Sequence, residues 1–115
     1  WVNYNDQYTT HIRHNHSNSL ISGIFYIDGA DTFKTTFFRQ GNLLEWDLNY
    51  TESNIFNTDQ ISIESEKNNM VIFPSSSYHE APINMNEEKR ISLSFNIWIR
   101  GEIGSNRMCT KLKLK

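Results

Sequence analysis

The sequence predicts an all-β fold built mostly of antiparallel strands, and three observations support this expectation. Short stretches of alternating apolar and polar residues recur along the 115-residue chain, as in strands that bury one face. Turn-forming residues separate these stretches. No stretch of about 11 residues has the apolar spacing of an amphipathic helix. Short strands joined by turns predict a sandwich or a barrel.

The predicted strands can be taken in order along the chain. An apolar and aromatic run at Ser19–Ile27 ends at Asp28-Gly29, a pair typical of turns. The polar stretch Asn49–Asp59 is predicted to be a loop. The shorter strands expected between Ser19–Ile27 and the C-terminal third of the chain are Thr35–Phe38, Leu43–Leu48, Ile61–Glu64 and Met70–Phe73. Pro74 stops the last of these, because proline cannot donate to a strand ladder.

The clearest strand is predicted to begin at Arg90 and to include Ile99. Alternate residues along an extended chain point to opposite faces. The apolar face then carries Ile91, Leu93, Phe95, Ile97 and Ile99, and the other face carries Arg90, Ser92, Ser94, Asn96 and Trp98. We expect residues 1–100 to form the core domain and residues 101–115 to be a C-terminal extension or an edge strand.

The composition predicts one domain with a single core. Apolar residues make up 37% and charged residues 21% of the 13.5 kDa chain, and the formal net charge is −2. This charge predicts no general attraction to nucleic acid or membrane, so we expect a small-molecule or protein side-chain substrate. Cys109 is the only cysteine, which favours a reducing compartment such as the cytoplasm. No apolar run approaches the roughly 20 residues of a membrane span.

A metal site is predicted from three histidines. His14 and His16 are two positions apart, so on an extended strand both imidazoles point the same way. His79 follows the strand that Pro74 ends and is the natural third ligand. Three ligands on one triangular face of an octahedron leave the opposite face open, as in non-haem Fe(II) oxygenases. With such histidines present, the best-fitting all-β fold is a double-stranded β-helix, a jelly roll of the cupin type.

An anion site is predicted beside the metal. Arg90 has a planar fork that can hold a carboxylate through two hydrogen bonds, and Ser92 lies on the same strand face. A guanidinium that points into a barrel needs an anion to pair with it. A dicarboxylate that chelates iron at one end and meets Arg90 at the other satisfies this need, and 2-oxoglutarate has that shape.

Three ordered segments then resemble a known family. They are His14–Ile27, Met70–Ser75 with His79, and Lys89–Asn96, with a further likeness at Trp1–Asn3. Together they resemble the 2-oxoglutarate/Fe(II)-dependent oxygenase superfamily, and most closely an uncharacterised group from marine bacteria and cyanobacterial phages. The chain is more distantly similar to prolyl hydroxylases. If the chain is phage-encoded, the expected compartment is the host cytoplasm.

The resemblance implies cofactors and a reaction. The cofactors would be Fe(II), held by His14, His16 and His79, and 2-oxoglutarate, held by Arg90, Ser92 and the hydroxyl of Tyr26. The reaction would convert 2-oxoglutarate to succinate and CO2 while a C–H bond of an unknown substrate is hydroxylated. Catalytic residues beyond the metal site are not predicted. The iron and cosubstrate supply the chemistry, and the protein supplies positioning.

The chain departs from the superfamily pattern at position 16, where the wider superfamily has Asp or Glu. A three-histidine site is less negative, which predicts weaker iron binding and altered redox behaviour. Asp28 or Asp31 could supply the missing carboxylate, although their place at a turn favours turn chemistry. His11 is a further candidate, but it lies an odd number of residues from His14 and would face away in a straight strand.

Two alternative functions come from other classes. One is a cupin-like metalloprotein that uses three histidines without 2-oxoglutarate, as another dioxygenase or an isomerase. The other is a non-catalytic jelly-roll binding module. The short chain also predicts that further strands or helices, or a second subunit, cover the apolar face of the strand at Arg90–Ile99, so homo-oligomerisation is an expectation. We expect Trp46 and Trp98 to pack rather than to stack on a substrate.

Overall fold

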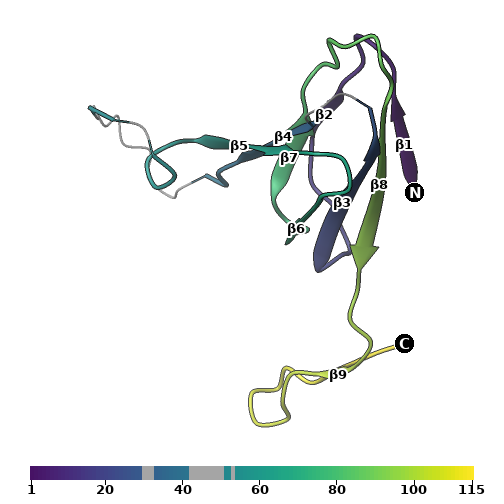
Figure 1. The fold of residues 1–115 in the computed structure, drawn as a ribbon. Helices are drawn as coiled ribbons and strands as arrows, with labels where there is room; N and C mark the ends of the chain where they lie inside the picture. The colour runs from purple at the N-terminus through teal and green to yellow at the C-terminus, as the bar shows by residue number, and fades with distance from the viewer. Residues whose placement is uncertain (30–32, 42–50, 53) are drawn as a thin grey trace.

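The computed structural model describes residues 1–29, 33–41, 51–52 and 54–115, and in these residues the fold is all-β (Figure 1). The strands are β1 (Val2–Asn5), β2 (His11–His14), β3 (Ile21–Asp28), β4 (Phe33–Phe38), β5 (Gln60–Ser65), β6 (Met70–Pro74), β7 (Tyr78–Ala81), β8 (Arg90–Ile97), β9 (Gly101–Ile103) and β10 (Leu112–Leu114). The predicted all-β, mostly antiparallel fold of the jelly-roll type is confirmed.

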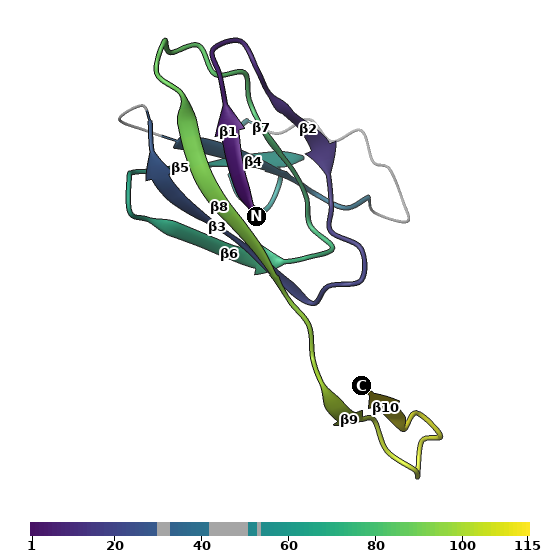
Figure 2. The same cartoon turned by 90° about the vertical axis from the view of Figure 1, so that its right-hand side faces the viewer.

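Eight strands form two four-stranded antiparallel sheets with the orders β1-β8-β3-β6 and β2-β7-β4-β5. Strands distant in sequence are therefore neighbours in each sheet, as a double-stranded β-helix requires. Side chains from both sheets meet between them: the ring of Phe37 in β4 lies 5.0 Å from that of Phe73 in β6. In the turned view the strands of one sheet run across those of the other (Figure 2).

The predicted strands compare well with the observed ones, with one correction. The strand predicted to include Ile99 ends at Ile97, so Trp98 and Ile99 lie beyond β8. The predicted strand at Leu43–Leu48 and Trp46 lie outside the described residues. Residues 54–59 contain turns and no strand, as expected of a loop. Five short strands were not predicted individually, namely β1, β2, β7, β9 and β10, because three or four residues are too few to show a convincing alternation.

The interior between the sheets is polar. Its buried apolar side chains among the described residues are only Tyr26, Phe33 and Phe73, whereas ten polar or charged residues are buried. In β8 the polar residues Arg90 and Ser94 are buried, while Leu93 and Ile97 on the alternate face are 38% and 47% exposed. Arg90 and Ser94 on the polar face of β8 are therefore turned inward, Asn96 on that face is exposed, and the apolar face lies partly exposed on the outside of the sheet. A second subunit covering that outer face stays a prediction.

Residues after β8 form a separate hairpin. Strands β9 and β10 pair with each other and with neither four-stranded sheet, and the hairpin extends away from the two sheets in both views (Figures 1 and 2). Across the described part of the chain, no helix is long and apolar enough to cross a membrane.

Candidate metal centre

Three histidines from two parts of the chain meet at one point. His14 ends β2 and pairs directly with His79 in β7, and His16 follows two residues later. A backbone hydrogen bond from the His16 N–H to the Ser75 carbonyl, 2.9 Å, holds that segment against the chain after β6. One ligand atom from each of the three rings lies within 4.8 Å of the others, so they can hold a metal ion together.

Hydrogen bonds aim the three rings. The Nδ1 atoms of His14 and His79 lie 2.7 and 3.0 Å from the backbone carbonyls of Ile12 and Ser77. A carbonyl only accepts, so each Nδ1 carries the proton and each Nε2 presents a lone pair. The side-chain oxygen of Asn96, 2.7 Å from His16 Nδ1, does the same for the third ring. The set thus has the orienting partners that metal-binding histidines usually have.

The spacing of the Nε2 atoms fits a shared cation. His14 Nε2 and His16 Nε2 are 3.3 Å apart. Two nitrogens each about 2.1 Å from one ion and at a right angle to one another are about 3.0 Å apart. The two nitrogens are also within hydrogen-bond distance of each other, and a cation bound to both would replace that contact. Imidazole nitrogens suit iron, zinc, copper and nickel, so the donor set fits a divalent transition metal.

A polar chain behind His16 fixes its position. Asn96 Oδ1 also accepts a hydrogen bond of 2.8 Å from the hydroxyl of Ser22, which lies 2.7 Å from the hydroxyl of Ser75. Ser22 and Ser75 are both fully buried. These bonds connect β3, the turn after β6 and β8 behind one ligand, so the position of His16 depends on three separate segments of the chain. No sequence pattern indicated this network except that Asn96 shares a strand face with Arg90.

The third ligand, His79, is set in an aromatic environment. Its ring lies 4.6 Å from that of Phe73 and 5.8 Å from that of Phe37, and the residue is 3% exposed. Burial lowers the pKa of His79 to about 4, and the nearby imidazoles of His14 and His16 add to this effect. His79 is therefore neutral and able to ligate at physiological pH.

Arg90 lies at the far end of the same interior, at the start of β8. The residue is 8% exposed, and its Nη2 donates a 2.7 Å hydrogen bond to the carbonyl of Pro82. No ion pair links it to a carboxylate within the described ranges. Gly29 lets the turn after β3 approach closely, because a Cβ there would lie 2.9 Å from the Arg90 Cα and the φ angle is +134°. A buried guanidinium with unused donors is a site for an anion.

Tyr26 and Ser92 are paired across β3 and β8. Ser92 lies two residues from Arg90 and therefore on the same face of β8. The Tyr26 ring stacks on Phe33, and its hydroxyl lies 2.7 Å from that of Thr35. Burial raises the pKa of Tyr26, and the Arg90 charge opposes this rise. Thr35 is 2% exposed and was not predicted as a neighbour of the site.

The expectation that His11 faces away from the site is wrong. Its register partner in β7 is Ala81, whereas His14 pairs with His79, so three residues of β2 span two residues of β7. This β-bulge reverses the alternation and brings His11 onto the same face as His14. Ile12 and Arg13, between them, are both exposed.

The alternative carboxylate ligands receive no support. Asp28 is exposed and forms a 2.8 Å ion pair with Lys67, and it is absent from the cluster of ligand atoms found in the described residues. Asp31 lies outside the described residues.

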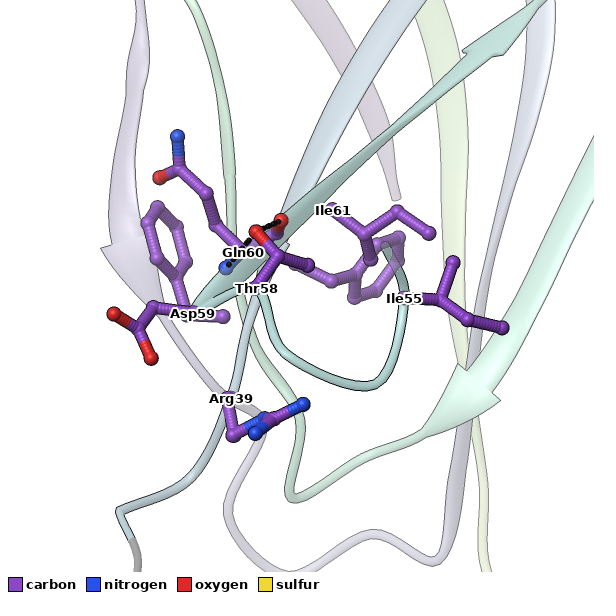
Figure 3. A pocket seen from close by; sticks show the side chains of 8 residues that line it. Arg39, Ile55, Thr58, Asp59, Gln60 and Ile61 are labelled. Carbon is purple, nitrogen blue, oxygen red and sulfur yellow. Dashed lines mark hydrogen bonds between the residues drawn. The ribbon is translucent and has the colours of Figure 1, made fainter. Parts of the chain in front are cut away.

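Two cavities lie beside the β2-β7-β4-β5 sheet. The first, about 210 Å³ (Figure 3), is lined by Phe37, Phe38, Arg39, Ile55, Thr58, Asp59, Gln60 and Ile61. The second, about 430 Å³, is lined by Arg13, Phe38, Arg39, Gln40, Gly41 and Tyr78. Neither contains a ligand histidine, but Phe37 separates the first from His79.

The fold and the histidine cluster define a class of protein: a double-stranded β-helix with an internal site that can hold a metal ion. A family model described as "Putative 2OG-Fe(II) oxygenase" matches residues 1–96, and the chain belongs to this family. No curated protein matches the chain. The match does not single out a subgroup, so the likeness to proteins of marine bacteria and phages stays a prediction.

Proposed function

We propose that this protein is a 2-oxoglutarate-dependent Fe(II) dioxygenase that hydroxylates a C–H bond of its substrate and releases succinate and CO2. The observation that carries the proposal is the pairing of two sites in one polar interior. Three imidazoles bring one ligand atom each to one point, and the buried guanidinium of Arg90 has no carboxylate partner among the described residues.

Charge complementarity supports a dicarboxylate as the ligand. Three neutral imidazoles leave the full double charge of Fe(II) uncompensated, and Arg90 adds a further positive charge. The superfamily's usual carboxylate ligand would cancel part of this charge, but here His16 takes its place. A dianion such as 2-oxoglutarate is therefore attracted by both the ion and the guanidinium, which favours its binding.

When bound, iron and 2-oxoglutarate supply the oxidative chemistry: one atom of O2 enters the succinate, the other enters the hydroxylated product, and the cosubstrate loses CO2. The residues of the chain bind and orient. His14, His16 and His79 hold the ion through Nε2. Arg90 holds the distal carboxylate, with hydroxyl donors from Ser92 and Tyr26. The buried position of Arg90 limits competition from water for that carboxylate.

Anaerobic binding measurements test the proposal without a known substrate. Purified protein should bind one Fe(II), and the loaded protein should then bind 2-oxoglutarate, as measured by calorimetry. In air the loaded protein should slowly convert 2-oxoglutarate to succinate. His79→Ala should abolish metal binding and with it the succinate. A wild-type protein that fails to bind either iron or 2-oxoglutarate would rule the proposal out.

A pair of arginine variants tests the anion site. Arg90→Gln should weaken 2-oxoglutarate binding by roughly 10- to 100-fold, because hydrogen bonds to a charged group contribute about 1.5–3 kcal/mol. Its affinity for Fe(II) should be unchanged. Arg13→Gln, the same change on an exposed residue, is the control and should leave both affinities as they are. Metal binding with no effect of Arg90→Gln would instead favour a three-histidine metalloprotein that does not use 2-oxoglutarate.

A further inference from the structure

A fourth imidazole lies in the interior that the metal centre and Arg90 share. The bulge in β2 places His11 on the inner face, opposite Ala81. The next residue after Ala81 is Pro82, and its carbonyl accepts the hydrogen bond from Arg90. His11 is thus next to the strand segment that anchors Arg90 and on the same face as His14.

Its location excludes His11 from the metal coordination. Ala81 is two residues from His79 along β7, a distance of roughly 7 Å at the rise of a strand. The cluster of ligand atoms within reach of one ion contains the other three histidines and not His11. His11 therefore lies farther along the paired strands β2 and β7 than the metal ligands, on the side where the Pro82 carbonyl binds Arg90.

The ring of His11 also differs from the ligand rings in its hydrogen bonds. Each ligand histidine is anchored at Nδ1. No residue in the described ranges forms a hydrogen bond with either nitrogen of His11. Burial, together with the charges of His14 and Arg90, lowers the pKa of His11, so the ring is neutral and offers one N–H donor.

We infer that His11 is a cosubstrate-binding residue that donates a hydrogen bond to the carboxylate of the bound dicarboxylate that Arg90 also holds. This inference rests on the proposed function, because it requires a dicarboxylate in that interior. A neutral donor at this place adds a contact without adding a further positive charge beside Arg90. A second donor from another strand also fixes the orientation of that carboxylate, which the guanidinium alone holds from one side.

Four proteins test the inference: the wild type, His11→Phe, His11→Gln and Ile12→Phe. His11→Phe keeps a ring but removes the donor, and His11→Gln keeps a donor. Ile12→Phe places the same new ring on the exposed face of the same strand as the matched control. For each protein, the Fe(II) affinity is measured by competition with a chelator, and the affinity of the metal-loaded protein for 2-oxoglutarate is measured anaerobically by calorimetry.

His11→Phe should raise the Kd for 2-oxoglutarate about tenfold, the equivalent of about 1.4 kcal/mol, with the Fe(II) affinity unchanged. His11→Gln should stay within about threefold of the wild type, and Ile12→Phe should match the wild type. If the phenyl ring prevents folding, His11→Leu makes the same comparison with a smaller apolar side chain. This split between the two affinities is not expected of a residue that only supports the strand.

The outcomes separate the two proposals. Wild-type protein that binds iron and 2-oxoglutarate, with His11→Phe binding both equally well, would overturn the role of His11 and leave the proposed function standing. Loss of iron in His11→Phe would also overturn it, because His11 would then act at the metal. Failure of the wild type to bind 2-oxoglutarate would refute the proposed function itself.

Discussion

The hydrogen bond behind His16 gives a prediction whose magnitude can be worked out from the structure. Asn96 Oδ1 accepts hydrogen bonds from His16 Nδ1 and from the Ser22 hydroxyl at 2.7 and 2.8 Å. Asn96→Ala removes both, each with a net contribution of about 1 kcal/mol. Only the bond to His16 orients a metal ligand, and Ser22 Oγ, 2.7 Å from Nδ1, still partners the ring. We therefore expect Asn96→Ala to bind metal about tenfold more weakly than the wild type, which is the smallest loss of affinity usual when a residue that orients a metal ligand is removed.

The assay is competition for Fe(II), or for Co(II) as a stable substitute, against a chelating dye under anaerobic conditions. Asn57→Ala is the matched control, because Asn57 also makes two hydrogen bonds, with Glu52 and Asn54, in a loop beyond β4. Asn96→Asp should bind metal at least as tightly as the wild type, since a carboxylate acceptor makes His16 a more basic ligand. Equal affinities in Asn96→Ala and the wild type, or an equal loss in Asn57→Ala, would refute this account of the ligand.

Three further predictions concern stability. The pKa of His79 is about 4 in the folded protein against an ordinary 6.5, so between these two pH values the unfolded chain binds more protons than the folded one. The free energy of unfolding of metal-free protein, measured by urea titration, should therefore fall as the pH falls from about 6.5 to 4. His79→Gln should make this dependence on pH weaker. Gly23→Ala should lower the free energy of unfolding by about 1–3 kcal/mol because a Cβ would overlap the Phe95 ring. The double variant with Phe95→Ala should lose less than the sum of the two single losses, because the overlap is then absent, and an unchanged melting temperature in Gly23→Ala would contradict that packing. Tyr26→Phe and Thr35→Val should each cost about 1 kcal/mol through their shared 2.7 Å hydrogen bond, and additive losses in the double variant would show that the bond contributes nothing.

Part of the site follows from alternation within single strands. Arg90 and Ser92, two positions apart within β8, share a strand face as expected, because the alternation of an extended chain depends only on that chain. His14 and His16 meet at one point as expected, but His16 lies beyond the end of β2 and is positioned by its hydrogen bonds with Ser75 and Asn96. The roles of Arg90, Ser92 and Tyr26 toward a cosubstrate stay predictions.

The residues that sequence reasoning missed all depend on another strand. His11 was placed on the wrong face because the bulge in β2 appears only when that strand is paired with β7. Thr35, Ser22 and Ser75 were missed because small hydroxyl residues on separate strands carry no local signal of the bonds they form.

By itself the sequence determined the all-β class, the polar and apolar faces of the last strand, and the chemical types of the candidate ligands. Only the tertiary structure decided that His79 lies opposite His14, that His11 joins them, and that Arg90 and Ser94 of β8 are buried. The physical reason is that the direction of a side chain along one strand is a local property. Register, bulges and burial, in contrast, are set by the partner strands that the chain finds when it folds.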